Sequence, residues 1–424
     1  MVWAILARIE RIGKQRELKM TGANDQVEKF LQALVGELAI PVSRYEQAET
    51  SYKSLGDWFH RPESTVRNFD PAVYVQGSFR LGTAIRPISD AEEYDVDSVC
   101  ELKKLTKNEL TQFDLRQLLG HEIKAYHDAK GMTKPVREGR RCWILSYADG
   151  AQFHMDVLPS LPNGSEQRLL LERAQFDARW ADTAIAITDR DVPTYRVRTA
   201  NWPRSNPKGY GEWFKSRMAS VLARRKQVLV ESLKRQGVTA SVEKLPDYRV
   251  RTPLQAAVML LKRHRDNMFT GEPDVKPISV IITTLAGHAY GEQDAISGAL
   301  SSILEGMERY IHHDGTKYII ANPTDPFENF ADRWEKDPRK AKAFFRWLEQ
   351  ARQDFGRAAH ATTLQRMNEA VSARMGTALT DRAVTKINGN GGGLLRTPSA
   401  APAAVAIPTF GNAPRVPTTP KGFA

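Results

Sequence analysis

The hydrophobic pattern along the chain predicts helices on both sides of a mixed central segment. Between Asp25 and Phe59 apolar residues recur every three to four positions, which is typical of an amphipathic helix. Pro41 falls inside this stretch and is expected to end one helix or begin the next. After Pro162 the same spacing returns and predicts a mostly helical lobe, with helices over 206–236, 253–269, 277–310 and 327–384.

The central segment combines strand and helix patterns. Ala72–Gln76 and Tyr94–Leu102 are rich in strand-forming residues, whereas Leu110–Ala129 has helical spacing. Two further strand-like runs, Arg141–Tyr147 and Gln152–Leu158, are joined by Ala-Asp-Gly, which predicts a β-hairpin. Strands separated by a helix and closed by a hairpin predict an α+β fold for this part of the chain.

These patterns predict four parts. We expect the α+β core with its N-terminal helix over residues 20–165, and the helical lobe over 166–387. Residues 388–424 hold six Gly and six Pro among 37 residues with almost no periodicity, so we expect a disordered tail. Residues 1–19 lack a signal-peptide core and are interpreted as a dispensable arm or, because Met20 is a plausible start, as upstream translation.

Composition excludes several classes of protein. Hydrophobic residues make up 41% and charged residues 26% of the chain, which excludes wholesale disorder. No apolar run reaches the ~18–20 residues that span a bilayer. Two cysteines, Cys100 and Cys142, are too few for a disulfide framework or a multi-cysteine zinc module. A net charge of +11 favours anionic partners. From the few cysteines and the lack of a long apolar run, we expect a soluble cytoplasmic protein that contacts no membrane.

A turn after the first strand has the residues of a phosphate site. Gln76, Gly77 and Ser78 follow a strand and precede a short helical pattern. Backbone N–H groups at such a helix start, together with the Ser78 hydroxyl, are suited to receive a triphosphate. Glycine lets the backbone approach the phosphate closely, although Gly-Ser alone is also a common turn.

Three aspartates make a metal site a sharper hypothesis. Asp95 and Asp97 are two residues apart on a predicted strand and therefore point to the same face. Their charges repel unless a cation lies between them, and carboxylate oxygens are the ligands that Mg²⁺ prefers. Asp156 stands in an otherwise apolar strand, where it needs a cation, a cleft or a salt bridge to Arg140 or Arg141.

His154 also lies near this set. It is two residues from Asp156 and shares its predicted face. We interpret it as a satisfied polar core residue rather than as a ligand.

The motifs resemble a known family. Gln76-Gly77-Ser78-Phe79-Arg80, Glu93-Tyr94-Asp95-Val96-Asp97 and His154-Met155-Asp156-Val157-Leu158-Pro159 are similar to those of the polymerase-beta nucleotidyltransferase superfamily. Within it they resemble bacterial cyclic-oligonucleotide synthases, the CD-NTases of CBASS anti-phage systems, which are related to cyclic GMP–AMP synthase and oligoadenylate synthase. The resemblance implies a nucleotidyltransferase palm followed by an oligoadenylate-synthase-like helical lobe.

The resemblance also implies a mechanism. Asp95 and Asp97 would hold two Mg²⁺ ions, or Mn²⁺ in their place. Asp156 would complete the site of the ion that activates the attacking ribose hydroxyl, while the other ion stabilises the leaving pyrophosphate. Gln76, Gly77 and Ser78 would hold the donor, which is ATP or another ribonucleoside triphosphate (GTP, UTP or CTP).

Two residues of the helical lobe match the family's triphosphate ligands. They are Lys262 and Ser279, a lysine on one helix and a hydroxyl at the start of the next. A surface lysine and a plain helix-start hydroxyl would explain the same residues. Weaker candidates for nucleotide contact or lobe closure are Arg86, Trp202, Asn206, Tyr210, Asn322–Pro326 and Trp334.

The resemblance finally implies partners. The cyclic product would activate a separate effector protein. Some synthases of this kind are conjugated through their last carboxylate by an E1/E2-like ligase, and the small residue Ala424 ends a tail long enough to reach such an enzyme.

The predicted function is therefore Mg²⁺-dependent synthesis of a cyclic di- or trinucleotide second messenger in anti-phage defence. One alternative is a template-independent RNA or protein nucleotidyltransferase, including adenylyl transfer. Another is a catalytically silent relative that binds nucleic acid.

Overall fold

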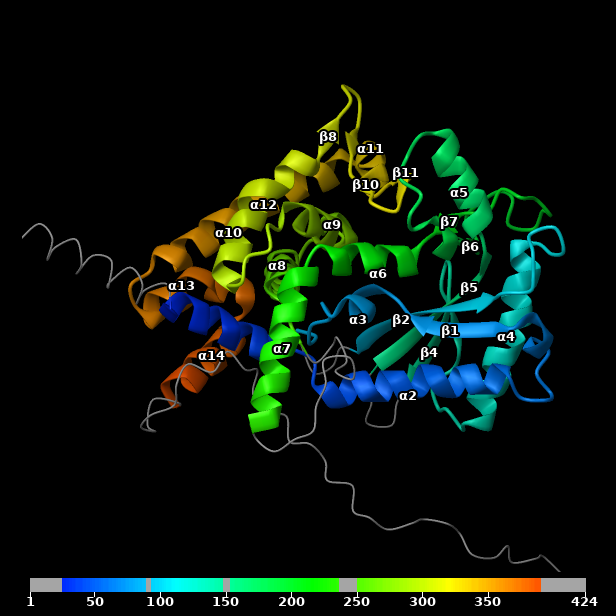
Figure 1. The fold of residues 1–424 in the computed structure, drawn as a ribbon, viewed down its shortest axis with the longest axis horizontal. Coiled ribbons are helices and arrows are strands. Elements are labelled where there is room, and N and C mark those ends of the chain that lie inside the picture. Colours follow the sequence, from blue (N-terminus) through cyan, green and yellow to red (C-terminus); the bar gives the residue numbers. More distant parts are fainter. Residues whose placement is uncertain (1–24, 89–92, 148–152, 236–249, 390–424) are drawn as a thin grey trace, which may run out of the picture.

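The computed structural model describes residues 25–88, 93–147, 153–235 and 250–389. These residues form two lobes that lie end to end in Figure 1, a sheet-containing lobe, which we call the palm, and a helical lobe. The expected arms 1–19 and 388–424, apart from the last helical residues up to 389, lie outside the described residues, as do Met20 and Ala424.

A seven-stranded sheet organises the palm. Its order is β1-β2-β5-β4-β3, with β6 added to β5 and β7 to β6. The pair β2–β5 is parallel and the other pairs are antiparallel. The elements are α2 Val42–Phe59, η1 Arg67–Phe69, β1 Pro71–Val75, α3 Gly77–Leu81, β2 Tyr94–Leu102, α4 Gln112–Ala129, β3 Arg137–Glu138, β4 Trp143–Tyr147, β5 Phe153–Pro162, α5 Gly164–Arg173, η2 Ala181–Thr183, β6 Ile185–Ile187 and β7 Arg204–Ser205.

The helical lobe follows the palm in the chain. Its helices are α6 Pro207–Ser216, α7 Ala219–Arg235, α8 Pro253–Met268, η4 Pro273–Val275, α9 Ser279–Ala289, α10 Ile296–Gly306, η5 Met307–Tyr310, α11 Asp332–Lys336, α12 Pro338–His360, α13 Leu364–Met375 and α14 Thr377–Gly389. Its short strands are β8 His312–His313, paired with β9 Tyr318–Ile319, and β10 Ala321–Asn322, paired with β11 Asp325–Asn329. The α+β fold class predicted from the pattern is confirmed.

Local sequence explains where the key helices begin. Thr111 caps α4 by accepting from the backbone N–H of Asp114, whose side chain accepts in return from the N–H of Thr111. Thr252 and Gln255 form the same capping box at α8, where Pro253 occupies the first helical position. These caps satisfy backbone N–H donors that have no partner within the first turn of the helix.

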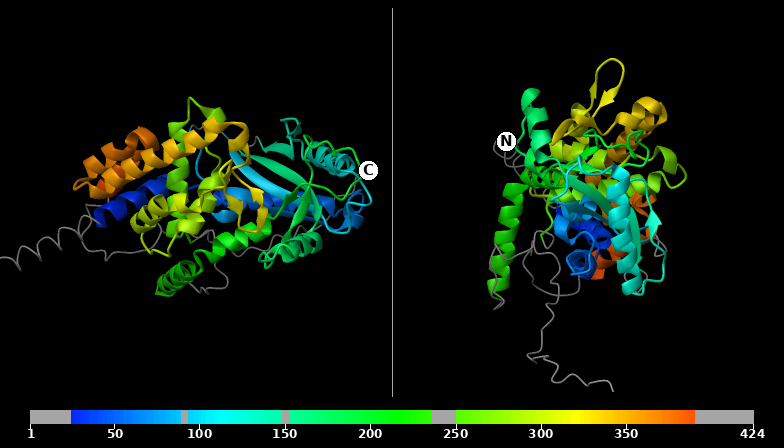
Figure 2. Two further views of the ribbon diagram at one scale, coloured as in Figure 1. Left: turned by 90° about the horizontal axis from the view of Figure 1, so that it is seen from above. Right: turned by 90° about the vertical axis from the view of Figure 1, so that its right-hand side faces the viewer.

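The N-terminal helix packs against a different lobe from the one we expected. Residues 25–38 are helical, and their buried side chains, Phe30 and Leu34 among them, join the hydrophobic core of the helical lobe. Figure 1 and the left view of Figure 2 both show this dark-blue helix beside α13 and α14. Pro41 separates it from α2, whose Leu55 and Phe59 join the palm core. One amphipathic stretch thus serves two cores.

Two other expectations need correction. The core was expected to end at residue 165, but β6 and β7 extend the palm sheet to Ser205. A helix was expected from residue 327, but β8–β11 form two small hairpins over 312–329. These strands have only two to five residues, too few to show a periodicity of their own. None of the described helices is long and apolar enough to cross a membrane.

Candidate active site

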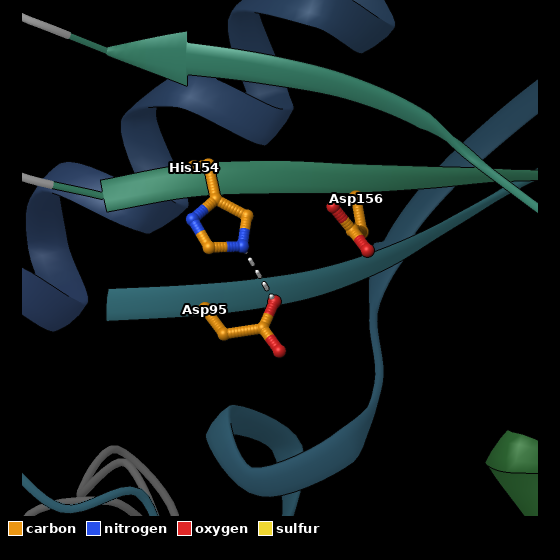
Figure 3. Close-up of side chains that lie close together, drawn as sticks. All are labelled: Asp95, His154 and Asp156. Atoms are coloured by element: carbon orange, nitrogen blue, oxygen red, sulfur yellow. Dashed lines mark ion pairs between the residues drawn. The ribbon is translucent and has the colours of Figure 1, made fainter. Parts of the chain in front are cut away.

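The parallel pair β2–β5 brings the predicted carboxylates together. Asp97 lies opposite Asp156 in the register, and Asp95 lies opposite His154. Since residues two apart share a face, all four side chains project from the same face of the sheet. Figure 3 shows three of them side by side, Asp95 from β2 and His154 with Asp156 from β5. One ligand atom from each of these three lies within 4.8 Å of the others.

Electrostatics at this cluster disfavour three bare carboxylates. Burial raises the pKa of Asp97 to about 7, and the charges of Asp95 and Asp156 add to the effect. The pKa of Asp95 is raised as well, first by burial and then by Asp156. A divalent cation would remove this penalty, because it favours the charged form of every carboxylate that it contacts.

The surroundings of Asp156 fit a cation ligand. Its Oδ1 is buried and has no hydrogen-bond partner among the described residues. Its Oδ2 accepts from the Cys142 thiol at 3.2 Å. The salt bridge considered as an alternative is not formed, because Arg140 and Arg141 both pair with Asp189 instead, at 2.7 and 2.8 Å. The carboxylate oxygens of Asp95, Asp97 and Asp156 are hard donors of the kind that Mg²⁺ or Mn²⁺ prefers.

The interpretation of His154 as a core residue is wrong. Its side chain is 26% exposed, and its Nε2 lies 3.5 Å from Asp95 Oδ1. Its Nδ1 lies 3.4 Å from Glu93 Oε2, and Glu93 also binds Lys134. The alternation of β5 puts His154 on the face of Asp156, and the register of β5 with β2 places it beside Asp95 in the site.

The phosphate turn lies directly against this cluster. Gly77 begins the five-residue helix α3 and has a φ of +59°. A Cβ at this position would lie 2.1 Å from Asp97 Oδ2, so only glycine fits between the turn and the carboxylate. The backbone N–H of Gln76 donates to the Asp97 carbonyl at 2.9 Å and fixes the turn to β2. Strand, Gly-Ser turn and helix follow one another as predicted.

A cleft of about 680 Å³ separates the palm from the helical lobe. Gly77, Ser78, Asp95 and Asp97 line its palm side. The helical lobe contributes the basic or hydroxyl side chains Lys262, Arg265, Lys276 and Ser279. Volumes of this order are typical of small-molecule sites.

Lys262 and Ser279 both line this cleft. Lys262 is only 7% exposed, and its Nζ donates to the Thr83 carbonyl at 3.1 Å. Burial, followed by the charge of Arg265, lowers its pKa to about 8. The Ser279 hydroxyl, at the first residue of α9, accepts from Arg265 at 3.0 Å. The burial of Lys262 excludes the alternative in which it is a surface residue.

Sequence reasoning missed several residues that line the cleft. Arg265 lies one helical turn after Lys262 on α8, so the helical repeat alone places both on one face. Lys276, which pairs with Asp266 at 3.5 Å, gives no comparable signal. Glu328 and Phe330 reach the cleft from the end of β11 and the residue after it, where the helix over 327–384 was expected to begin.

The weaker candidates divide into two groups. Asn206, Tyr210, Arg86 and Asn322 line the cleft, and the first three also make local bonds that fix them. Trp202 is buried in the palm core and Trp334 in the helical core, and neither is among the described residues that line the cleft. The rest of Asn322–Pro326 forms a turn in which Asn322 accepts from Thr324.

Comparison with known proteins finds a similar domain. A family model described as the nucleotidyltransferase domain of cyclic GMP-AMP synthases of the DncV-like type matches residues 71–159, which contain all three aspartates. Residues 71–159 are therefore similar to a DncV-like nucleotidyltransferase domain. The resemblance stated from the sequence motifs is confirmed.

Two similar proteins match most of the length of this chain. A protein of Roseivirga ehrenbergii named c-di-GMP synthase is 26% identical over 332 residues, 77% of this chain and 78% of its own. The cyclic dinucleotide synthase CdnG of Bradyrhizobium diazoefficiens is 24% identical over 339 residues, 75% of this chain and 73% of its own. The solved structure of that CdnG with GTP superposes with a TM-score of 0.62 at 20% identity, covering 85% of this chain and 99% of that one. The fold is therefore shared across both lobes.

Proposed function

We propose that this nucleotidyltransferase joins ribonucleoside triphosphates into a cyclic di- or trinucleotide second messenger. The observation that carries the proposal is the position of Asp95, Asp97 and Asp156 on one face of β2–β5, beside a glycine turn and opposite Lys262. The names of both relatives favour a dinucleotide product, and the first favours guanine as its base.

Each group has a defined part in this proposal. Asp95, Asp97 and Asp156 would hold divalent cations, which would lower the pKa of the attacking hydroxyl and neutralise the leaving pyrophosphate. Gly77 and Ser78 would bind the donor triphosphate from the palm. Lys262 and Ser279 would bind it from the helical lobe, so that closing the two lobes brings donor and acceptor into line. A linear intermediate must then turn over in the cleft so that its free hydroxyl attacks the remaining triphosphate.

Incubation with Mg²⁺ and the four labelled ribonucleoside triphosphates, followed by phosphatase, tests the proposal. A labelled product that resists phosphatase supports a cyclic nucleotide. Labelled RNA or labelled protein would instead support the alternative nucleotidyl transfer, and absence of any product would support the silent relative. The Asp95→Asn variant is the matched control, since it keeps the side-chain shape and removes one ligand charge.

The proposal extends to the cell. We infer that the cyclic product activates a separate effector in anti-phage defence and that the enzyme works in the cytoplasm. The C-terminal carboxylate of Ala424 would be the point of conjugation by an E1/E2-like ligase, although this residue lies outside the described residues.

Deleting Ala424 tests the conjugation part separately. The deletion should abolish conjugate formation in cells that carry the ligase and leave cyclic-nucleotide synthesis in vitro unchanged. The measurements are immunoblotting for conjugates and the labelled-nucleotide assay. Loss of synthesis would show instead that the terminus belongs to the catalytic body.

A further inference from the structure

The two carboxylate oxygens of Asp156 have different surroundings. Oδ2 accepts a hydrogen bond from the thiol of Cys142, with 3.2 Å between sulfur and oxygen. Oδ1 is buried without a hydrogen-bond partner among the described residues. Because the thiol occupies one oxygen, the other is left for a cation. The side chain that fixes this asymmetry comes from the residue just before β4, the strand that pairs with β5.

Cys142 belongs to a loop that is held from within the palm. Arg116, on α4, is fully buried and donates to the carbonyls of Gly139 at 2.6 Å, Cys142 at 3.0 Å and Arg140 at 3.3 Å. The N–H of Gly139 donates to the Cys142 carbonyl at 2.9 Å. A planar guanidinium that binds three carbonyls fixes the backbone on which the thiol sits.

The same loop also holds the thiol in place and keeps positive charge away from Asp156. A Cβ at Gly139 would lie 2.8 Å from the Cys142 sulfur, so the glycine leaves space for the thiol. The cationic neighbours Arg140 and Arg141 form ion pairs with Asp189 instead of with Asp156. The only hydrogen bond to Asp156 Oδ2 among the described residues therefore comes from a neutral group.

A neutral donor suits a cation ligand better than a charged one. An arginine or lysine on Asp156 would neutralise the carboxylate and compete with the metal. The S–H group of a thiol is an uncharged and only weak hydrogen-bond donor. It therefore orients the carboxylate and leaves its negative charge available.

We propose that Cys142 is a positioning residue that orients Asp156 for divalent-cation binding, with Arg116 holding the loop that carries it. The inference rests on the proposed function, because it takes Asp156 to be a metal ligand. Partners that orient a metal ligand commonly contribute ~10-fold or more to metal affinity or activity.

The test measures Mn²⁺ binding directly, by electron paramagnetic resonance of free Mn²⁺, in the absence of nucleotide turnover. Cys142→Ala should weaken binding by roughly 10-fold. Cys142→Ser keeps a neutral donor at the same position and should restore binding close to the level of the unaltered protein. Cys100→Ala is the matched control, because Cys100 is buried in the same sheet without a bond to any of the three aspartates, and its binding should stay unchanged.

Asp156→Asn separates failure of this inference from failure of the proposed function. If the unaltered protein binds Mn²⁺, Asp156→Asn does not, and Cys142→Ala binds as tightly as the unaltered protein, the role of Cys142 is overturned and the metal site stands. Mn²⁺ binding that is unaffected by Asp156→Asn overturns both. Thermal melting of each variant identifies misfolding, and weakened binding by Cys142→Ala with an unchanged melting temperature and rescue by Cys142→Ser supports the proposal. Failure of the serine variant to rescue, at an unchanged melting temperature, also overturns it.

Discussion

At the scale of single residues, burial and neighbouring like charges raise the pKa values of carboxyl groups in the candidate active site. Asp97 has the most strongly perturbed carboxyl of the cluster, with a pKa raised to about 7 by burial and by Asp95 and Asp156. Lys262, across the cleft, has a pKa lowered to about 8 by burial, and the two opposite charges partly offset each other. Perturbed groups that converge on a cleft are typical of functional sites.

The Asp97→Asn variant should be inactive yet more stable than the unaltered protein when metal is absent. A carboxyl whose folded pKa is raised from 3.8 to about 7 binds a proton more tightly in the folded state. Its contribution to stability is therefore lost as pH rises from about 4 to 7. The gain in unfolding free energy should be at least about 1 kcal/mol at pH 8, the equivalent of one pKa unit, and smaller at pH 5. Chemical denaturation in chelator at both pH values measures it.

Adding Mg²⁺ provides the control for that measurement. The ion should stabilise the unaltered protein more than Asp97→Asn and reduce the difference between them at pH 8. An equal effect of Mg²⁺ on both proteins would contradict the assignment of Asp97 as a ligand.

At the scale of elements, the site depends on how β1, α3 and β2 meet. The turn at Gly77 is bound to β2 through the backbone of Gln76 and touches Asp97 with no space for a side chain. The register of the parallel pair β2–β5 determines the position of the third aspartate, because it places Asp156 opposite Asp97. A slip by one residue would turn Asp156 to the other face of the sheet.

Gly77→Ala should abolish nucleotide transfer, because its Cβ would collide with Asp97 Oδ2. Gly131→Ala is a matched control, since Gly131 has a φ of +60° but a Cβ added there would meet no atom within 4 Å. Both variants carry the cost of a left-handed backbone, about 1–2 kcal/mol. Only Gly77→Ala should lose product in the labelled-nucleotide assay. Loss of activity in both variants would mean that general destabilisation, not the contact with Asp97, is responsible.

At the scale of the whole molecule, α8 ties the helical lobe to the palm. Gln255 donates to the Leu81 carbonyl at 2.9 Å, Lys262 to Thr83 at 3.1 Å, and Arg263 to Pro87 at 3.2 Å. One face of α8 therefore binds the end of α3 and the segment that follows it, up to Pro87. This arrangement couples the position of Lys262 to the shape of the turn.

Lys262→Met should raise the KM for the nucleotide substrate by ~10-fold or more, since a hydrogen bond to a charged group contributes about 1.5–3 kcal/mol. Lys342→Met, on an exposed position of α12, removes the same charge from the helical lobe and should change KM little. Steady-state kinetics of both variants measure the difference. Equal changes in the two would mean that net charge, rather than a local contact, governs substrate binding.

The sequence motifs by themselves determined much of the site. Alternation on a strand is a local rule, so Asp95 and Asp97 were placed on one face, and the Gly-Ser turn was placed before a helix. The helical spacing of the second half likewise predicted α8 and a helix from residue 277, where α9 begins two residues later at Ser279. Local steric and periodic rules suffice for such features because they depend on neighbours in the chain.

Only the tertiary structure decided what depends on distant partners. The helix over 25–38 carries the same apolar period whichever core buries it, so its place in the helical lobe was not readable. His154 lies in the site because β5 pairs with β2 in a register that places it opposite Asp95. Cys142 lies beside the site because its thiol contacts Asp156 on the neighbouring strand. Asp97 and Lys262 are buried because the palm and the helical lobe pack around the same cleft. This burial raises the pKa of Asp97 and lowers the pKa of Lys262. The sequence specifies which residue types are present, whereas tertiary packing determines the burial and the neighbours of each one.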